Sequence, residues 1–432
     1  MKVFAYPAQD KWVDLVKRPT ENYGAIEESV KSILKSVENR GDKALIELTK
    51  KFDKIAINNL KVNANTTRSA KKEIPARLKN AIDTAYKNIY AFHATQVSKV
   101  QKIETTKGVI CWRKSIGIEK VGLYIPGGSA PLFSTVLMLG IPAQIAGCKE
   151  VILCTPPDKT GAINPAILYA ADKCGIKNIY MVGGAQAIAA MAYGTKAIAK
   201  VDKIFGPGNS YVMIAKQLVS LKGVAIDMPA GPSEVLVIAD DSADASFVAA
   251  DLLSQAEHGP DSQVILVSTS KKLAEEVNKE IAEQLKVLPR KAVAEKALNN
   301  SSAILLKNLD SAIDFSNLYA PEHLILSCSN GEKLAEKVIN AGSVFIGNYT
   351  PESAGDYASG TNHTLPTNGY ARAYSGVSVD SFVRKVTFQK ITPDGLVKLG
   401  STIEIMAEAE QLQAHKNAVT IRLNSIKKKK NV

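Results

Sequence analysis

Histidine is scarce in this chain, which has only five among 432 residues. Four of them, His258, His323, His363 and His415, lie in short polar segments of the C-terminal half. Imidazole binds divalent metals and moves protons near neutral pH. A chain with so few histidines, placed beside glutamine, glutamate and aspartate, is predicted to build one chemical site from them.

Cysteine is also sparse, with five residues and no C-x-x-C pair. Most lie in apolar stretches such as residues 151–154, which excludes a disulfide framework and predicts reduced core residues. Long hydrophobic runs are missing too. The most apolar stretch, residues 136–148, is interrupted by Gly140, Pro142 and Gln144, and the first residues lack the apolar core of a signal peptide. We therefore expect a cytoplasmic protein with no membrane segment.

The charge is unbalanced, with 54 lysines and arginines against 42 acidic residues, a net +12. Four of the surplus positive charges lie in one terminal run, residues 427–430. The chain has no zinc-finger, RRM or KH pattern and no basic stripe interleaved with aromatics, so no nucleic-acid partner is predicted. A positive field would equally suit an anionic small molecule such as a dinucleotide.

The hydrophobic patterning predicts an α/β protein with two tandem, doubly wound parallel sheets, each an incomplete Rossmann-like unit. We expect residues 1–118 to be a helical region that packs on the second α/β domain. Residues 119–232 are predicted to form one Rossmann-like domain, and residues 233–370 a second one that carries most of the candidate site residues. Residues 371–432 are too few to bury a core alone and are predicted to pack on another part of the protein or another subunit.

Gln255 and His258 are three residues apart at the predicted end of a helix, which places them on one face. With Asp356 in a glycine-flanked loop and His415 in the tail, they offer two imidazoles, a carboxylate and an amide oxygen, a set that can hold Zn²⁺. A helix-terminal histidine is more often a cap or a core residue, so spacing alone favours that alternative over a metal ligand.

Glu322 and His323 are adjacent at a predicted helix-to-strand junction, where they could serve as bases for water and for an alcohol proton. The alternative is a surface glutamate beside a half-buried histidine. Glycine turns at residues 127–128, 183–184 and 206–209 each follow a predicted strand and precede a helix. Their amides suit phosphates, although none is a G-x-G-x-x-G fingerprint and plain βα turns remain the alternative.

Seven segments together resemble the histidinol dehydrogenase family. They are VGLYIPGG (121–128), KIFGPGN (203–209), IDMPAGPSE (226–234), LLSQAEHGPD (252–261), APEHL (320–324), GDYASGTNHTLP (355–366) and EQLQAHKNAVTIR (410–422). They occur in order and cover nearly the whole chain.

The resemblance implies oxidation of L-histidinol to L-histidine by two NAD⁺ through an aldehyde-level intermediate, in the last steps of histidine biosynthesis. It also implies a homodimer with one Zn²⁺ per subunit, in which a C-terminal arm, residues 371–432, completes the partner's site. The implied zinc ligands are Gln255, His258, Asp356 and His415, and the implied proton acceptors are Glu322 and His323. The implied substrate contacts are Ser233, Glu410, His323 and the zinc ligands. Residues 119–232 are implied to be the NAD-binding domain, with Tyr124, Gln186 and Asn209 as NAD contacts. The role of His363 stays open.

Two other functions compete with this interpretation. A zinc hydrolase would use Glu322 to activate water and would need no NAD. A basic nucleic-acid-binding protein would show affinity that falls steeply with salt and would ignore histidinol.

Overall fold

The computed structural model describes residues 1–19, 23–127, 131–229 and 231–430. Gly128 of the first glycine turn and Ala230 of the 226–234 motif lie outside the described residues. The chain divides into a large unit, Met1–Gln96 with Ile118–Phe382, and a small unit, Val97–Gly117 with Val383–Val432. No helix of the described residues is long and apolar enough to cross a membrane.

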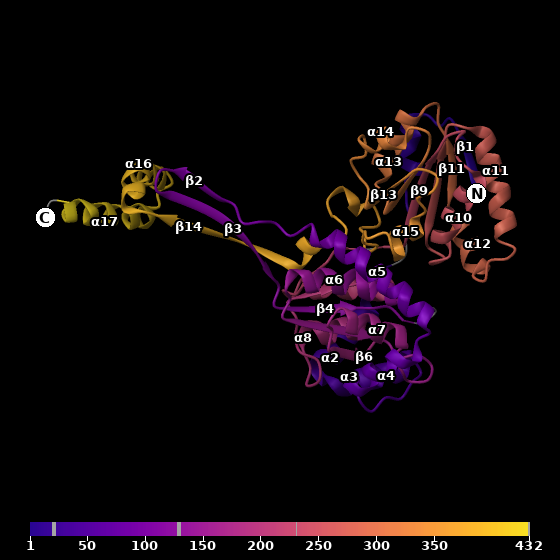
Figure 1. The fold of residues 1–432 in the computed structure, drawn as a ribbon, viewed down its shortest axis with the longest axis horizontal. Coiled ribbons are helices and arrows are strands. Elements are labelled where there is room, and N and C mark those ends of the chain that lie inside the picture. The colour runs from indigo at the N-terminus through magenta and orange to yellow at the C-terminus, as the bar shows by residue number, and fades with distance from the viewer. Residues whose placement is uncertain (20–22, 128–130, 230, 431–432) are drawn as a thin grey trace. The chain divides into compact units, whose positions relative to one another are not determined.

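The first sheet of the large unit is fully parallel, with strands in the order β6-β5-β4-β7-β8. Its strands are β4 (Lys120–Tyr124), β5 (Glu150–Thr155), β6 (Asn178–Met181), β7 (Lys203–Phe205) and β8 (Ala225–Ile226). Helices α6 (Phe133–Ala146) and α7 (Pro165–Lys173) cover one face, and α8 (Gly184–Tyr193) and α9 (Ser210–Ser220) cover the other. Figure 1 labels α6, α7 and α8 beside strands β4 and β6. Strands buried on both faces have near-continuous apolar sequences, which is why the sequence predicts them well.

The second sheet is also parallel, in the order β1-β11-β10-β9-β12-β13. Its strands are β1 (Lys2–Ala5), β9 (Glu234–Ala239), β10 (Gln263–Ser268), β11 (Ser302–Leu305), β12 (His323–Ser327) and β13 (Ser343–Ile346). Helices α10 (Ala245–Ala256), α11 (Lys271–Gln284) and α12 (Lys291–Asn299) pack on one face, and α1 (Trp12–Leu15), α13 (Leu309–Tyr319) and α14 (Gly331–Ala335) on the other. The predicted parallel α/β class is therefore confirmed.

Both sheets follow one winding. Numbered from its own first interior strand, each has the order 3-2-1-4-5, and β1 adds an edge strand to the second sheet. That is a Rossmann strand order without the sixth strand. Successive strands are added on one side of β4 or β9 and then on the other, so the strand order reverses beside these two strands. In such sheets ligands gather where the order reverses, so the ends of β4, β7, β9 and β12 are the places to seek a site.

The N-terminal helices correct one expectation. Helices α2 (Tyr23–Arg40), α3 (Asp42–Phe52), α4 (Ala64–Glu73) and α5 (Ala76–Ala94) pack against helices of the first sheet, not the second. Within this region, β1 pairs with β11 and so joins the second sheet. Helical periodicity identifies an apolar face but does not say which neighbour buries it.

The small unit holds a three-stranded antiparallel sheet in the order β14-β3-β2 and two helices. Its elements are β2 (Lys102–Thr106), β3 (Val109–Gly117), β14 (Val383–Ile391), α16 (Pro393–Ala409) and α17 (Gln413–Lys430). The expected arm of residues 371–432 is thus wrong at both ends, because residues 371–382 belong to the large unit and residues 97–117 to the small one. Strand β3 pairs with β14 across some 270 positions of chain, a contact that no local pattern reveals.

Candidate active site

A cavity of about 380 Å³ lies in the large unit, between the carboxyl ends of β4 and β7 and the amino ends of β9 and β10. Its walls are formed by loop residues on both sides and by the first turn of α9. They are Pro126, Leu132, Pro207, Gly208, Asn209, Ser210 and Met213 from the first sheet, and Gly231, Pro232, Ser233, His258, Gly259, Pro260, Asp261 and Ser262 from the second. Three predicted site residues, Asn209, Ser233 and His258, therefore share one cavity.

The turn after β7 is held in a conformation that requires glycine. Gly206 has φ +131°, and a Cβ there would meet the Tyr124 carbonyl oxygen at 2.1 Å. Its amide donates to Asp227 Oδ2 at 2.8 Å, and its carbonyl accepts from Lys216 Nζ at 2.9 Å. Asn209 then caps α9 by accepting from the Val212 amide at 3.2 Å. The result is a fixed helix N-terminus at the cavity wall, which suits a phosphate group.

Lys216 and Asp227 form a buried ion pair under this turn, with side chains 4% and 1% exposed. We expect Lys216→Met to lower the free energy of unfolding by roughly 3–5 kcal/mol, because it leaves the Asp227 charge buried and uncompensated. Urea denaturation followed by circular dichroism measures the change. The control is Lys222→Met, which removes an exposed lysine paired with Glu38 and should alter stability little. Equal losses of unfolding free energy in the two variants would contradict the conclusion that the buried Lys216–Asp227 pair stabilises this turn.

Two predicted NAD contacts lie elsewhere in the first sheet. The Tyr124 side chain is buried at the end of β4, and its oxygen accepts from the Gly184 amide at 3.0 Å. Burial raises the pKa of Tyr124 to about 12, so the phenol stays protonated at neutral pH. Gln186, on α8, is 2% exposed. Neither residue lines the 380 Å³ cavity, so their contact with NAD stays a prediction.

The candidate metal ligands of the large unit come together beside this cavity. Nitrogen and oxygen atoms of His258, Glu352 and Asp356 lie within 4.8 Å of one another, a spacing that can hold a metal ion. Gln255 is 1% exposed in the last turn of α10, and its Oε1 has no hydrogen-bond partner. Asp356 Oδ1 is likewise buried and unpartnered. Buried polar atoms are rarely left unpaired, and these two oxygens are therefore available to a cation.

Glu322 and His323 adjoin this cluster at the amino end of β12. His323 Nδ1 lies 2.9 Å from Gln255 Nε2, 3.2 Å from the Glu234 carbonyl oxygen and 3.6 Å from Glu322 Oε2. Its Nε2 lies 3.5 Å from Asp356 Oδ1 and makes no hydrogen bond. That nitrogen is therefore available to a molecule bound at this centre. Glu322 accepts from the Glu234 amide at 2.9 Å, which fixes one carboxylate oxygen.

The cluster carries an excess of negative charge. Burial alone would lower the pKa of His323, but Glu352, Glu322 and Asp356 raise it well above its ordinary value. Burial alone would raise the pKa of the Asp356 carboxyl, but the neighbouring His323 imidazole lowers this pKa overall. Several carboxylates thus face one imidazole, and a divalent cation would complete the charge balance.

Glu352 is the site residue that the sequence analysis missed. It lies on α15 (Glu352–Tyr357), is 1% exposed, and burial raises its pKa to about 8. Asp356 was expected in a loop but stands on this same short helix, four residues after Glu352. The signal was therefore the i, i+4 spacing of two carboxylates, which has meaning only once a helix is recognised there.

His363, whose role was left open, uses both ring nitrogens within the protein. Nδ1 lies 2.9 Å from the Asp356 carbonyl oxygen, and Nε2 lies 3.0 Å from Thr135 Oγ1. Burial lowers the pKa of His363, so the imidazole is held neutral. These contacts support the segment that carries Asp356.

Glu410 and His415 belong to the small unit. Glu410 follows the last residue of α16, His415 lies in the first turn of α17, and both side chains are exposed. Their predicted contacts with substrate and metal therefore remain predictions.

Two Rossmann-like sheets, a cavity between their edges and an adjoining cluster of metal-type ligands and proton acceptors are the features of an α/β dehydrogenase. The comparisons with known proteins are more specific. The family model for histidinol dehydrogenase matches residues 16–423. A histidinol dehydrogenase from Bacteroides thetaiotaomicron is 59% identical over 427 residues, covering 99% of this chain and all of that one. One from Vibrio cholerae is 53% identical, with 96% of each chain covered.

A solved structure of histidinol dehydrogenase from Elizabethkingia anophelis superposes with a TM-score of 0.96 at 56% identity, covering 99% of both chains. The chain belongs to the histidinol dehydrogenase family.

Proposed function

We propose that the chain oxidises L-histidinol to L-histidine with two NAD⁺ per substrate, through an aldehyde-level intermediate, in the last steps of histidine biosynthesis. The observation that carries the proposal is the meeting of five side chains around one centre, in a chain that belongs to this family: Gln255, His258, Glu322, His323 and Asp356.

The donor set fits a zinc ion. Gln255, His258 and Asp356 supply an amide oxygen, an imidazole and a carboxylate, and the unpartnered oxygens of Gln255 and Asp356 are available to it. His415 of a partner chain is the proposed fourth ligand. Bound there, zinc would supply a Lewis acid that holds nitrogen donors of the amino alcohol without taking part in redox chemistry.

The two bases divide the proton transfers. His323, through Nε2, accepts the hydroxyl proton as the carbinol carbon loses hydride to the first NAD⁺, which gives the aldehyde and NADH. Glu322 then removes a proton from water as the water oxygen adds to the aldehyde carbon, which gives the hydrate. A second hydride transfer from that carbon, with loss of one hydroxyl proton, yields the carboxylic acid and the second NADH, and the acid then loses its proton to give the carboxylate. Burial of both side chains keeps bulk water from this centre.

The dinucleotide is proposed to bind along the carboxyl edge of the first sheet. Asn209 and the helix N-terminus behind it face the cavity, and Tyr124 and Gln186 lie along the same edge. Ser233, on the opposite wall, would contact histidinol together with the metal ligands.

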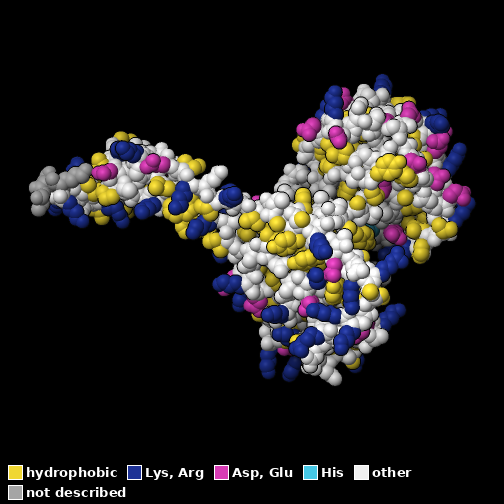
Figure 2. Space-filling model, in the orientation of Figure 1, with side chains coloured by type: hydrophobic (Ala, Val, Ile, Leu, Met, Phe, Trp, Pro, Cys, Tyr) yellow, Lys and Arg dark blue, Asp and Glu magenta, His cyan; other side chains and the backbone are white. Residues whose placement is uncertain are grey.

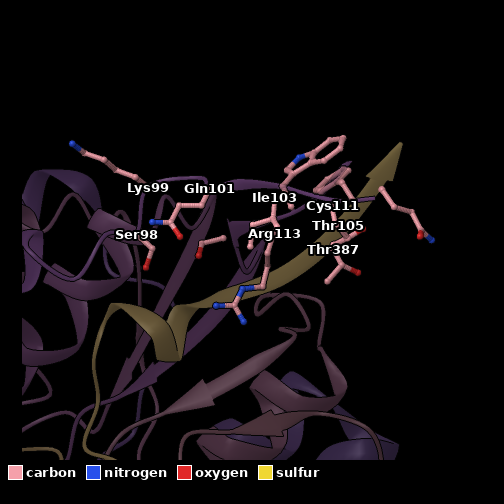
Figure 3. A pocket seen from close by; sticks show the side chains of 12 residues that line it. Ser98, Lys99, Gln101, Ile103, Thr105, Cys111, Arg113 and Thr387 are labelled. Atoms are coloured by element: carbon pink, nitrogen blue, oxygen red, sulfur yellow. The ribbon is translucent and has the colours of Figure 1, made fainter. Parts of the chain in front are cut away.

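We further propose that two chains form a homodimer through the small unit. Few of its side chains are buried, while Ile103, Ile405 and Met406 are 61%, 64% and 60% exposed. Its hydrophobic surface is visible in Figure 2. A groove of about 830 Å³ runs along its sheet, and Figure 3 shows Ile103, Cys111, Arg113 and Thr387 among the side chains that line it. A unit this small needs a partner to cover such apolar surface.

One assay tests the activity. Purified protein with zinc, histidinol and NAD⁺ is followed by NADH absorbance, and we expect about two NADH per histidinol consumed. A zinc hydrolase or a nucleic-acid-binding protein would give no histidinol-dependent reduction, and that result would end the proposal.

Mixing two inactive variants tests the shared site. His323→Asn damages the large unit and His415→Asn the small unit of its own chain. Random exchange of subunits should restore about a quarter of wild-type activity, because one site in each mixed dimer then contains both histidines. NADH formation before and after exchange measures the recovery. No recovery, with mixed dimers demonstrated by native mass spectrometry, would show that each chain completes its own site.

A further inference from the structure

Two helices of the large unit each present a pair of metal-type donors. Gln255 and His258 lie three residues apart at the end of α10, and Glu352 and Asp356 lie four apart on α15. The spacing of Glu352 and Asp356 places both on one face of α15, whereas His258 lies in the turn two residues beyond Ala256, the last residue of α10. The ligand set implied by the family takes three of these four residues and adds His415. Glu352 has no assigned role in it.

Glu352 is nevertheless placed like a ligand. It is 1% exposed, and its Oε2 has no hydrogen-bond partner. One of its carboxylate oxygens lies within 4.8 Å of the donor atoms of both His258 and Asp356. A buried carboxylate oxygen without a partner costs free energy that a bound cation would recover. Gln255 Oε1 and Asp356 Oδ1 are unpartnered in the same way.

We propose that Glu352 is an internal ligand, which holds the cation in the large unit when His415 of a partner is not in place. Gln255, His258, Glu352 and Asp356 then form a four-donor set within one chain, enough for the tetrahedral coordination that zinc favours. Binding of the partner's His415 would add a donor, or replace one, at a centre that already holds the zinc ion. This inference rests on the proposed function for the identity of the metal, but it concerns binding alone.

The test measures zinc binding to the full-length chain without turnover. Metal-stripped His415→Asn is titrated with Zn²⁺ against a chromophoric chelator, and bound zinc is counted by mass spectrometry. We expect about one zinc per chain in His415→Asn. Adding Glu352→Gln should weaken binding by about 10–100-fold or more, while Glu352→Gln alone should cost less because His415 remains. The matched control is Glu336→Gln in the His415→Asn background, an exposed glutamate whose loss should leave the dissociation constant unchanged.

Three outcomes would overturn the inference: no zinc in His415→Asn, equal affinity with and without Glu352, or equal loss in the Glu336→Gln control. Circular dichroism establishes that each variant is folded. If Glu352→Gln does not fold, Glu352→Asp keeps the charge but withdraws it by one methylene. An affinity unchanged by that shift would count against direct ligation. Because wild-type histidinol oxidation is measured separately, failure of the proposed function and failure of this inference give different results.

Discussion

Replacing His258 with asparagine is expected to remove bound zinc and histidinol oxidation together. His258 supplies an imidazole to the candidate metal cluster of the large unit, and it lines the 380 Å³ cavity. Loss of a supporting contact around a metal typically costs about 10–100-fold in affinity, so loss of a direct ligand should cost at least about 100-fold. Zinc content after dialysis and NADH formation measure the two effects.

The exposure of His258 makes this result interpretable. An exposed side chain packs little, so the substitution should change the free energy of unfolding by no more than about 0.5 kcal/mol. The contrasting variant is His363→Asn, because both ring nitrogens of His363 lie within hydrogen-bond distance of other protein groups. It should lose stability but retain zinc. A His258→Asn protein with full zinc and full activity would remove this residue from the ligand set.

Glu322→Gln is expected to slow aldehyde oxidation by about 10²–10⁴-fold, the usual contribution of a general base, and alcohol oxidation much less. Glutamine matches the shape of glutamate, and its carbonyl oxygen can still accept from the Glu234 amide, which now bonds Glu322 at 2.9 Å. The local fold should therefore survive while the capacity to deprotonate water is lost.

The two half-reactions separate the roles. Single-turnover NADH formation from histidinol reports the alcohol step, and turnover of supplied histidinal reports the aldehyde step. His323→Asn is the complementary variant, in which the alcohol step should suffer more. Equal losses in both steps for Glu322→Gln would refute the division of labour between the two bases.

The strands of the two parallel sheets were predictable because burial on both faces leaves a direct mark on the sequence. Strands such as β9 and β10 are buried at every position, and their residues are almost all apolar. The partner of β3 was not predictable, because β14 lies far along the chain and their pairing depends on backbone hydrogen bonds. The neighbours of α2 to α5 escaped prediction for a similar reason, since an apolar helix face fits more than one surface.

The site shows the same contrast. Gln255 and His258 could be paired from spacing, because both belong to one helix end. Glu322 and His323 lie at the amino end of β12, the end that strand topology alone does not favour for a ligand. They lie beside a cavity only because the amino edge of the second sheet borders the cavity at the carboxyl edge of the first. Glu352 was missed because α15 is a six-residue helix with a central glycine, too short for periodicity to detect.

The pairing of β3 with β14 limits how the protein can be shortened. A stop codon after Phe382 would delete β14, α16 and α17 but keep β2 and β3, whose backbone groups would then form an open, sticky edge. The chain leaves the large unit after Gln96 and after Phe382, and it returns at Ile118. These points lie close together, because the Val379 amide donates to Gln96 Oε1 at 2.9 Å and the Ile118 amide donates to the Phe382 carbonyl at 2.9 Å. Removing both segments of the small unit would therefore leave no unpaired strand. A minimal single-chain scaffold would therefore need a short linker from Gln96 to Ile118 as well as the new C-terminus.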